Sequence, residues 1–178
     1  DENRIMWGTG KSVPSLDLNK DFMPDSIRSL NLSYIKINEQ FYDFNNLHDS
    51  TGGKISFSSI NPFQNYPEGL TLSYNQNHLS FHFSAIDWSA PDKIKYSYRL
   101  IGSDANWSIP SHNSFAEYRN LQHGSYELQI KAIGRSQIWT KTFSYHFTIR
   151  PPWWLMWWFK SVVIFLLLSL IFLIARFI

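Results

Sequence analysis

Residues 121–132 read LQHGSYELQIKA, a glycine turn followed by a tyrosine and a strand-like stretch. Alternate residues of this stretch are apolar, namely Tyr126, Leu128, Ile130 and Ala132. A period of two is the pattern of a strand with one buried face. A tyrosine just after such a turn is typical of the tyrosine corner of β-sandwiches, in which the phenol hydroxyl bonds to upstream backbone. We therefore expect Tyr126 to be a structural residue.

The same alternation recurs on both sides of this strand, between Leu70 and Ile149. The alternating or strand-like stretches are residues 70–74, 79–85, 95–101, 115–118, 126–132 and 143–149. Glycine, asparagine, aspartate and serine residues separate them and mark turns. Many short strands at this spacing predict an all-β fold of the β-sandwich type.

The C-terminal segment from Trp153 to Ile178 is predicted to be a single membrane-spanning helix. Lys160 is its only charge before Arg176, and at about 1.5 Å per residue the segment is long enough to cross a hydrocarbon core of roughly 30 Å. A buried helix of a soluble protein is the alternative, but residues 162–174 are apolar all round apart from Ser169. Arg176 weakly favours a cytoplasmic C-terminus under the positive-inside rule.

The start of this segment is rich in tryptophan, a residue that prefers the headgroup boundary of a bilayer. The junction residues are Pro151, Pro152, Trp153, Trp154, Trp157 and Trp158. Lys160 is close enough to this end to extend its ammonium outward. The two prolines lack N–H donors and fix φ, so they favour a stiff, extended link between the last strand and the helix.

Composition bounds the remaining function classes. The 178 residues carry a net charge of +2 without a basic cluster, so nucleic acid is not an expected partner. There is no cysteine, which excludes disulfides and thiolate metal sites. The first residues resemble no signal peptide, and we expect the chain to be a fragment or a processed product, delivered across the membrane by something upstream.

No arrangement of residues predicts catalysis, a cofactor or a metal. His78 and His82 have the spacing of helical metal ligands, but they flank a strand, so paired ligation has no geometric support. Asp87 and Asp92 are interpreted as turn residues around Pro91. We therefore expect that the chain is not an enzyme and has no catalytic, cofactor-binding or metal site.

Large aromatic residues outside the alternating positions are candidates either for the core or for a binding surface. Trp107 is predicted to fill the core, as large rings in sandwiches usually do. Trp139 precedes the last strand, where it either caps the core or stacks on a sugar or a protein partner. Core capping is the favoured interpretation for Trp139. Trp88 is the third aromatic candidate for the core or a binding surface.

Residues 70–160 resemble the triple-tyrosine (Y_Y_Y) domain, a fibronectin-type-III-like (Ig-like) sandwich found just outside the membrane in Bacteroidetes-type sensor proteins with periplasmic β-propellers. The matching pieces are 79–85 (LSFHFSA), 96–102 (YSYRLIG) with Trp107, 118–121 (YRNL), 124–126 (GSY) and 151–154 (PPWW). The resemblance implies a structural tyrosine motif formed by Tyr96, Tyr98, Tyr118 and Tyr126. It also implies that a Pro-Pro-x-Trp element joins the last strand to the membrane helix.

Residues 4–40 look like the end of a propeller and its exit strand, because 6–10 (MWGTG) is similar to the core of such blades. Only one blade-like unit is present, whereas several must stack to bury their faces. The expected organisation is therefore a propeller-end β segment and linker at 1–69, a Y_Y_Y sandwich at 70–150, and a junction with the transmembrane helix at 151–178.

The resemblance implies a function in two-component signal transduction. The protein is expected to cross the inner membrane once, with residues 1–150 in the periplasm. These residues are expected to relay a conformational change from an upstream propeller, for which a glycan is a candidate ligand, to a cytoplasmic histidine kinase outside this chain. Membrane lipid and a second copy of the chain, as a homodimer, are the expected partners. The alternative is a membrane-anchored carbohydrate- or protein-binding module in which the helix is only a tether.

Overall fold

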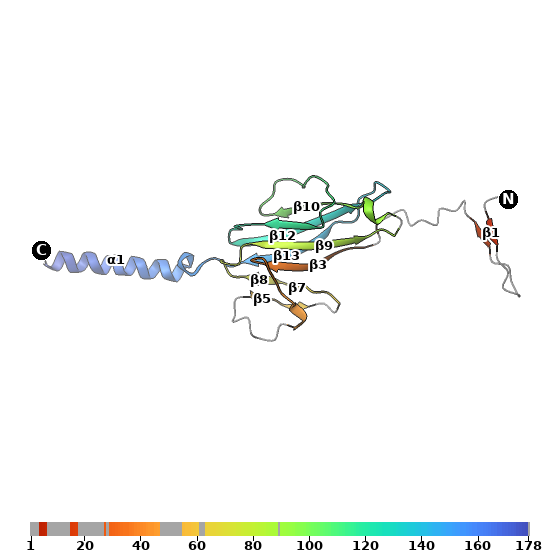
Figure 1. Cartoon of the computed structure of the whole chain (residues 1–178). Coiled ribbons are helices and arrows are strands. Elements are labelled where there is room, and N and C mark those ends of the chain that lie inside the picture. Colours follow the sequence, from red (N-terminus) through yellow and green to blue (C-terminus); the bar gives the residue numbers. More distant parts are fainter. Residues whose placement is uncertain are drawn as a thin grey trace.

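Two β-sheets and one long helix dominate the structure, a computed structural model that describes residues 4–6, 15–17, 27, 29–46, 55–60, 63–88 and 90–177. The sheets pack face to face, and helix α1 (Trp157–Phe177) extends from one end of them (Figure 1). The predicted all-β sandwich with one C-terminal apolar helix is therefore confirmed.

The first sheet has five strands in the order β10-β12-β13-β8-β5. Their bounds are β10 (Lys95–Ile101), β12 (Gly124–Ile133), β13 (Phe143–Ile149), β8 (Leu70–Leu72) and β5 (Ile55–Ser56). All neighbours are antiparallel except β13 and β8, which run parallel. The last strand before the membrane is consequently an interior strand of the sheet, paired on both sides.

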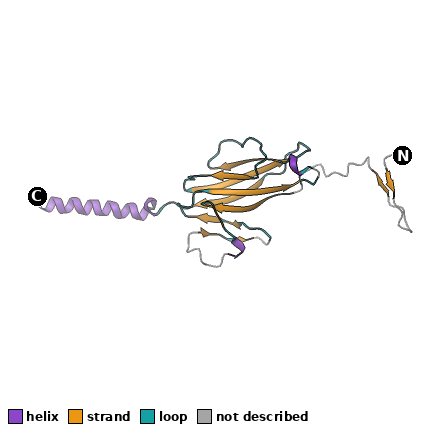
Figure 2. Ribbon diagram, viewed as in Figure 1, coloured by secondary structure: helices purple, strands orange, loops and turns teal. Residues whose placement is uncertain are grey.

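The second sheet has four antiparallel strands in the order β11-β9-β3-β4. Their bounds are β11 (Phe115–Tyr118), β9 (Leu79–Ile86), β3 (Ser29–Ile37) and β4 (Gln40–Phe41). Smaller elements complete the described residues. These are the hairpins β1 (Arg4–Met6) with β2 (Ser15–Asp17) and β6 (Ser59–Ile60) with β7 (Pro67–Glu68), and the 3₁₀ turns η1 (Phe44–Asn46), η2 (Pro91–Lys93) and η3 (Trp153–Leu155), drawn in Figure 2.

The predicted domain boundary at residues 69–70 is wrong, because earlier strands belong to both sheets. β3 pairs with β9 from Ser29 opposite Ile86 to Ile37 opposite Leu79, and β5 pairs with β8. A bulge between Leu32 and Tyr34 shifts the register of β3, so its period of two is interrupted. The propeller-like residues Trp7 to Gly10 lie outside the described residues.

The core between the sheets is largely aromatic. Phe81 and Phe83 point inward from β9 and meet rings from the opposite sheet, with centroids 5.4 Å apart for Phe81 and Phe147 and 5.1 Å apart for Phe83 and Tyr96. Tyr126 stacks on Phe147 at 5.3 Å. These residues occupy the apolar positions of the alternating stretches, so the period-two pattern assigned the buried faces of β9, β10, β12 and β13 correctly.

Residues 108–111 cover the outer edge of β10. Tyr96 N–H donates to the Ser111 carbonyl at 2.7 Å, and Ser108 N–H donates to the Tyr98 carbonyl at 2.8 Å. The Ser97 hydroxyl donates to the Ser108 carbonyl at 2.8 Å, which explains how this outward-facing serine is buried. The edge groups of β10 are thus satisfied, which protects the sheet from pairing with another chain.

Helix α1 begins four residues later than the sequence pattern indicates. Pro152 is extended (φ −65°, ψ 151°), Trp153–Leu155 forms a 3₁₀ turn, and the α-helix starts at Trp157. Residues 157–176 have a mean hydropathy of 2.5 and are not buried against the sandwich. Among the described residues this is the one helix that is long and apolar enough to cross a membrane.

The aromatic core makes a direct stability prediction. Phe81 is fully buried, and Phe81→Ala should lower the free energy of unfolding by about 3–5 kcal/mol because the cavity cannot collapse between two sheets. Ile86 lies on the same strand with 45% of its surface exposed, so Ile86→Ala is the matched control and should cost well under half as much. Denaturant unfolding of the full chain in detergent, followed by near-UV circular dichroism, measures both. Equal losses would contradict the assigned core.

Candidate functional site

The candidate functional site is the junction at which the sandwich meets α1. Arg150 follows β13, and its N–H donates to the Leu72 carbonyl at 2.8 Å, which continues the parallel pairing with β8. Its guanidinium donates through Nη2 to the Ser56 hydroxyl of β5 at 3.0 Å. The last residue before the prolines is therefore held by two neighbouring strands.

The two prolines connect this anchored residue to the tryptophan turn. Pro152 is buried, whereas Pro151 is exposed. The Pro152 carbonyl accepts from Leu155 N–H at 3.0 Å, and the Trp153 carbonyl accepts from Met156 N–H at 3.2 Å. Because proline fixes φ and the next residues form a closed turn, the connection has few free torsions.

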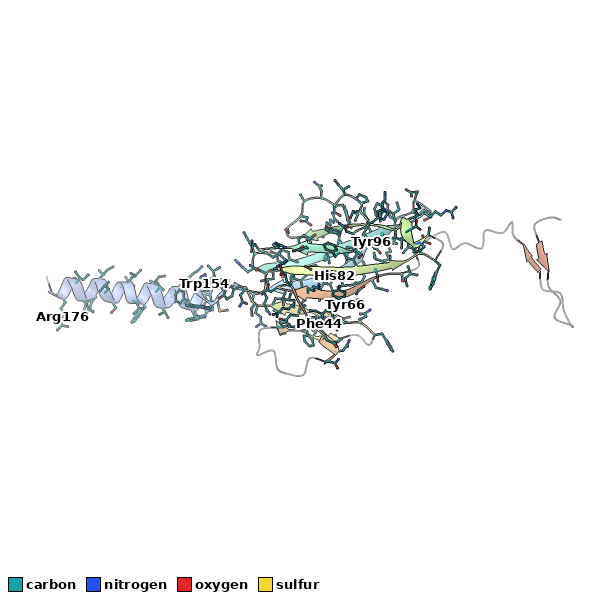
Figure 3. All side chains as sticks on the ribbon, viewed as in Figure 1. Phe44, Tyr66, His82, Tyr96, Trp154 and Arg176 are labelled. Atoms are coloured by element: carbon teal, nitrogen blue, oxygen red, sulfur yellow. The ribbon has the colours of Figure 1, made fainter. Side chains whose placement is uncertain are left out.

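The tryptophan turn packs on both the helix and the sandwich. The Trp153 ring meets Phe159 of α1 at a centroid distance of 4.9 Å and Trp154 at 5.5 Å. Trp154 in turn packs edge-on against Tyr74, with centroids 5.0 Å apart. Figure 3 shows Trp154 where the sandwich gives way to the helix. Successive contacts between aromatic rings thus connect the loop after β8 with the first turn of α1.

The loop carrying Tyr74, residues 73–78, is also bonded to the other sheet. Asn38, in the turn between β3 and β4, donates from Nδ2 to the Asn75 carbonyl at 3.0 Å and from its N–H to the His78 carbonyl at 2.7 Å. Leu121 N–H donates to the Asn77 carbonyl at 3.1 Å. We call residues 73–78 the junction loop. It connects both sheets with the tryptophan turn.

Charged side chains surround the end of the junction loop. His78 Nε2 lies 2.8 Å from Glu117 Oε1, and Arg119 Nη2 lies 2.6 Å from the same oxygen. The hydrogen bonds from Arg119 and then from His78 hold the pKa of the Glu117 carboxyl below its usual range. His78 is thus paired with the Glu117 carboxylate at the end of the sheet that carries the junction loop.

His82, the other histidine of the candidate pair, has different neighbours. It stacks between Tyr34 at 4.3 Å and Phe115 at 5.7 Å on the outer face of the four-stranded sheet. Burial lowers its pKa, and the nearby Lys36 lowers it further. His78 thus contacts a carboxylate whereas His82 stacks on aromatic rings, and the described residues contain no cluster of three or more metal-ligating side chains.

Tyr126 has the geometry of a tyrosine corner. Its hydroxyl donates to the Gln122 carbonyl at 2.8 Å, four residues upstream, as the sequence predicted. Gly102 adopts φ +100°, and a Cβ at that position would come within 2.9 Å of the Tyr126 ring, so a glycine is required there. Burial raises the pKa of Tyr126.

The other tyrosines of the motif are hydrogen-bonded or packed against other aromatic rings. Tyr118 donates to Asp104 Oδ2 at 2.7 Å, and that oxygen also accepts from Leu100 N–H at 2.8 Å. The Tyr96 hydroxyl accepts from Ala85 N–H at 3.1 Å. Tyr98 is half-buried against Phe83 and Tyr118. Burial and then Asp104 raise the pKa values of Tyr118 and Tyr98.

Sequence reasoning missed Tyr145, whose hydroxyl is also buried. The hydroxyl donates to the Pro67 carbonyl at 2.7 Å, and the ring packs edge-on against Tyr66 at 5.6 Å. Burial strongly raises its pKa. Alternation in residues 143–149 placed the ring inside, but no local signal points to a partner 78 residues upstream.

Two tryptophans lie where the sequence did not predict them. Trp107 is on the outer face of the five-stranded sheet, half-buried, with Lys131 Nζ 4.2 Å and Arg99 Cζ 4.7 Å from its ring centroid. Trp139 lies 4.5 Å from the same Lys131 ammonium. The core predictions for both are wrong, because each approaches the sheet from a loop outside it and packs on long cationic side chains.

These features define a β-sandwich joined through a proline–tryptophan turn to a long apolar helix, and comparison with known proteins assigns part of the chain to a family. Residues 87–150 match the Y_Y_Y domain family. The chain therefore contains a Y_Y_Y domain, as the sequence resemblance predicted. The comparison with curated proteins found no match.

Solved extracellular domains from B. thetaiotaomicron share the fold. Two structures of the BT4673 extracellular domain, named in one case for a one component system and in the other for a hybrid two component system, are 26% and 30% identical to this chain. They cover 85% and 71% of it, with TM-scores of 0.57 and 0.53. The extracellular domain of BT3049, of the hybrid two component type, is 20% identical over 85% of the chain, with a TM-score of 0.54, and shows the fold alone.

This chain spans only 16–19% of the length of these three structures. The comparisons and α1 together identify a membrane protein with an extracytoplasmic part, of the kind found in signalling systems.

The corner hydrogen bond can be tested by removing one atom. Tyr126→Phe should lower the free energy of unfolding by about 1 kcal/mol or more, because the Gln122 carbonyl loses its donor. Tyr42 also donates a hydrogen bond, to Gln40, but this bond lies on the exposed surface. Tyr42→Phe is therefore the control and should change the free energy of unfolding by only about a few tenths of a kcal/mol. Equal thermal unfolding midpoints for the two variants would contradict the assignment of Tyr126 as a tyrosine corner.

The buried tyrosines predict a loss of stability at alkaline pH. The folded-state pKa values of Tyr118 and Tyr145 are raised above the ordinary value of about 10, so the unfolded chain releases these protons first. Their contribution is complete below pH 10 and falls as the pH rises above it. Unfolding midpoints between pH 8 and pH 11 should show this decline. In Tyr145→Phe, less stable at neutral pH, the decline should be shallower; an identical slope would contradict the assignment.

Proposed function

We propose that this chain is the juxtamembrane part of a single-pass sensor in the cytoplasmic (inner) membrane. In this proposal an upstream propeller region binds a ligand, of which glycans are one class, and the sandwich passes the resulting displacement through α1 to a cytoplasmic output of the histidine-kinase type. A second copy of the chain acts as partner in a homodimer. The similarity to extracellular domains of signalling systems supports this role.

The observation that carries the proposal is the absence of a flexible segment between β13 and α1. Residues 150–156 read RPPWWLM, without glycine or serine. The first of these residues is bonded to β8 and β5, and Trp154 is packed on Tyr74. A displacement of the sheet is therefore transmitted to the helix, whereas a Gly-Ser linker would absorb it.

A binding or adhesion module is the second candidate. It is favoured by exposed tryptophans, since 78% of Trp88 and 37% of Trp139 are accessible to solvent. Such rings on a sandwich can stack on a sugar or a protein partner. A tether needs no stiff junction, however, so rigidity of residues 150–156 separates the two candidates.

Rigidity can be measured without knowing the ligand. The chain contains no cysteine, so spin labels can be placed specifically at Lys141→Cys, before β13, and Ser161→Cys, in α1. Pulsed electron–electron double resonance on the full chain in nanodiscs should give a narrow distribution of distances between the two spin labels. Replacing Pro151 and Pro152 by Gly-Ser should broaden it markedly, while Pro110→Gly, in an exposed loop, should not. A broad distribution in the unmodified junction would overturn the relay mechanism.

The same substitution tests signalling in the complete protein. Gly-Ser in place of Pro151 and Pro152 should reduce ligand-dependent output of a transcriptional reporter, screened with a panel of oligosaccharides, because displacement is lost in the linker. Membrane expression should stay unchanged. Pro110→Gly is again the control. Full output from the Gly-Ser variant would favour the tether.

A further inference from the structure

The end of the sandwich that carries the junction loop is placed close to the bilayer by the short connection to α1. Residues 157–176 span about 30 Å at 1.5 Å per residue, which matches the hydrocarbon thickness of a bilayer. Trp157 therefore lies at the hydrocarbon boundary. Trp154 is only three residues earlier, and three residues of even a fully extended chain reach at most about 10 Å, so Trp154 lies at the level of the headgroup layer.

The depth of Tyr74 can differ from that of Trp154 by no more than the 5.0 Å between their ring centroids. The two rings are in edge-to-face contact, with centroids 5.0 Å apart. Tyr74 belongs to the sandwich and not to the helix, and the junction loop is fixed to both sheets through Asn38 and Leu121. A residue of the folded domain, Tyr74, is thus placed at the level of the headgroup layer together with Trp154.

The exposed groups at this end suit a headgroup layer better than water. Trp153, Trp154 and Tyr74 leave 51%, 40% and 40% of their surfaces accessible, side by side at the end of the sandwich. Tyrosine and tryptophan combine an apolar ring with a polar tip and are enriched at membrane interfaces for that reason. Asn75, next to Tyr74, is exposed and offers an amide to phosphate or ester oxygens.

We propose that the junction loop is a lipid-docking surface, through which the sandwich itself rests on the phospholipid headgroups beside α1. Tyr74 inserts its ring among the headgroups next to Trp153 and Trp154, and Asn75 contacts them from the exposed side of the loop. The bilayer then limits tilting of the sandwich relative to α1. Motion in the membrane plane and rotation about the membrane normal remain free.

The proposal is tested by the distance of two loops from the lipid. In the full chain, which lacks native cysteine, Asn75→Cys places a label on the junction loop, and Asp92→Cys places one in η2, at the opposite end of the sandwich (Figure 2). The hydrogen bond from Asn38 to residue 75 uses the backbone carbonyl and is kept. Each variant is labelled with bimane in nanodiscs of phosphatidylcholine and phosphatidylglycerol that contain headgroup-nitroxide lipid.

The label at position 75 should be quenched several-fold more than the label at position 92. In the Asn75→Cys background, Tyr74→Ala should reduce this quenching, while Tyr74→Phe, which keeps the ring on Trp154, should retain most of it. Equal quenching at both positions, or none at position 75, would overturn the proposal. Unchanged quenching in a folded Tyr74→Ala variant would also overturn the role of Tyr74.

Discussion

The parallel pairing of β13 with β8 is the constraint on which the rest of the structure depends. It makes the last strand an interior strand, held by β12 on one side and β8 on the other. The pairing continues through Arg150 N–H to the Leu72 carbonyl, so the ladder ends only where the prolines begin. Pulling on this end loads several strands together, because hydrogen bonds on both sides resist displacement. A strand at the edge of the sheet would peel away under the same load.

The tyrosine hydroxyls show how this aromatic core avoids unpaired polar groups. Three of the core tyrosines donate to a backbone or carboxylate partner, Tyr126 to Gln122, Tyr118 to Asp104 and Tyr145 to Pro67. An unpaired buried hydroxyl would cost about 1–3 kcal/mol. The bonds to Gln122 and Pro67 also tie loops to strands, so the tyrosines position connections as well as filling space. Tyr74 differs, because it stays exposed and joins the sandwich to the tryptophan turn.

The proposed relay through the junction and the proposed lipid contact have a joint consequence for signalling. A sandwich whose junction loop contacts the phospholipid headgroups cannot tilt freely about Pro151 and Pro152. The motions left to it are rotation about the membrane normal and translation within the plane. Both are motions that a helix can carry across a bilayer without changing its depth. Under these two proposals the junction favours rotation or lateral movement of α1 over a piston movement along its axis.

The sequence by itself determined the local features of this protein. Alternation identified the inward faces of β9, β10, β12 and β13, the apolar run identified α1, and the glycine–tyrosine pattern identified the corner at Tyr126, because each depends on neighbours within a few residues. Only the tertiary structure decided the place of β3 in the sandwich, the partner of Tyr145, the outer position of Trp107 and the contact of Tyr74 with Trp154. Each of these joins residues far apart in the chain or brings a loop over a sheet. Pairing of that kind depends on how all strands are arranged together, which no local pattern encodes.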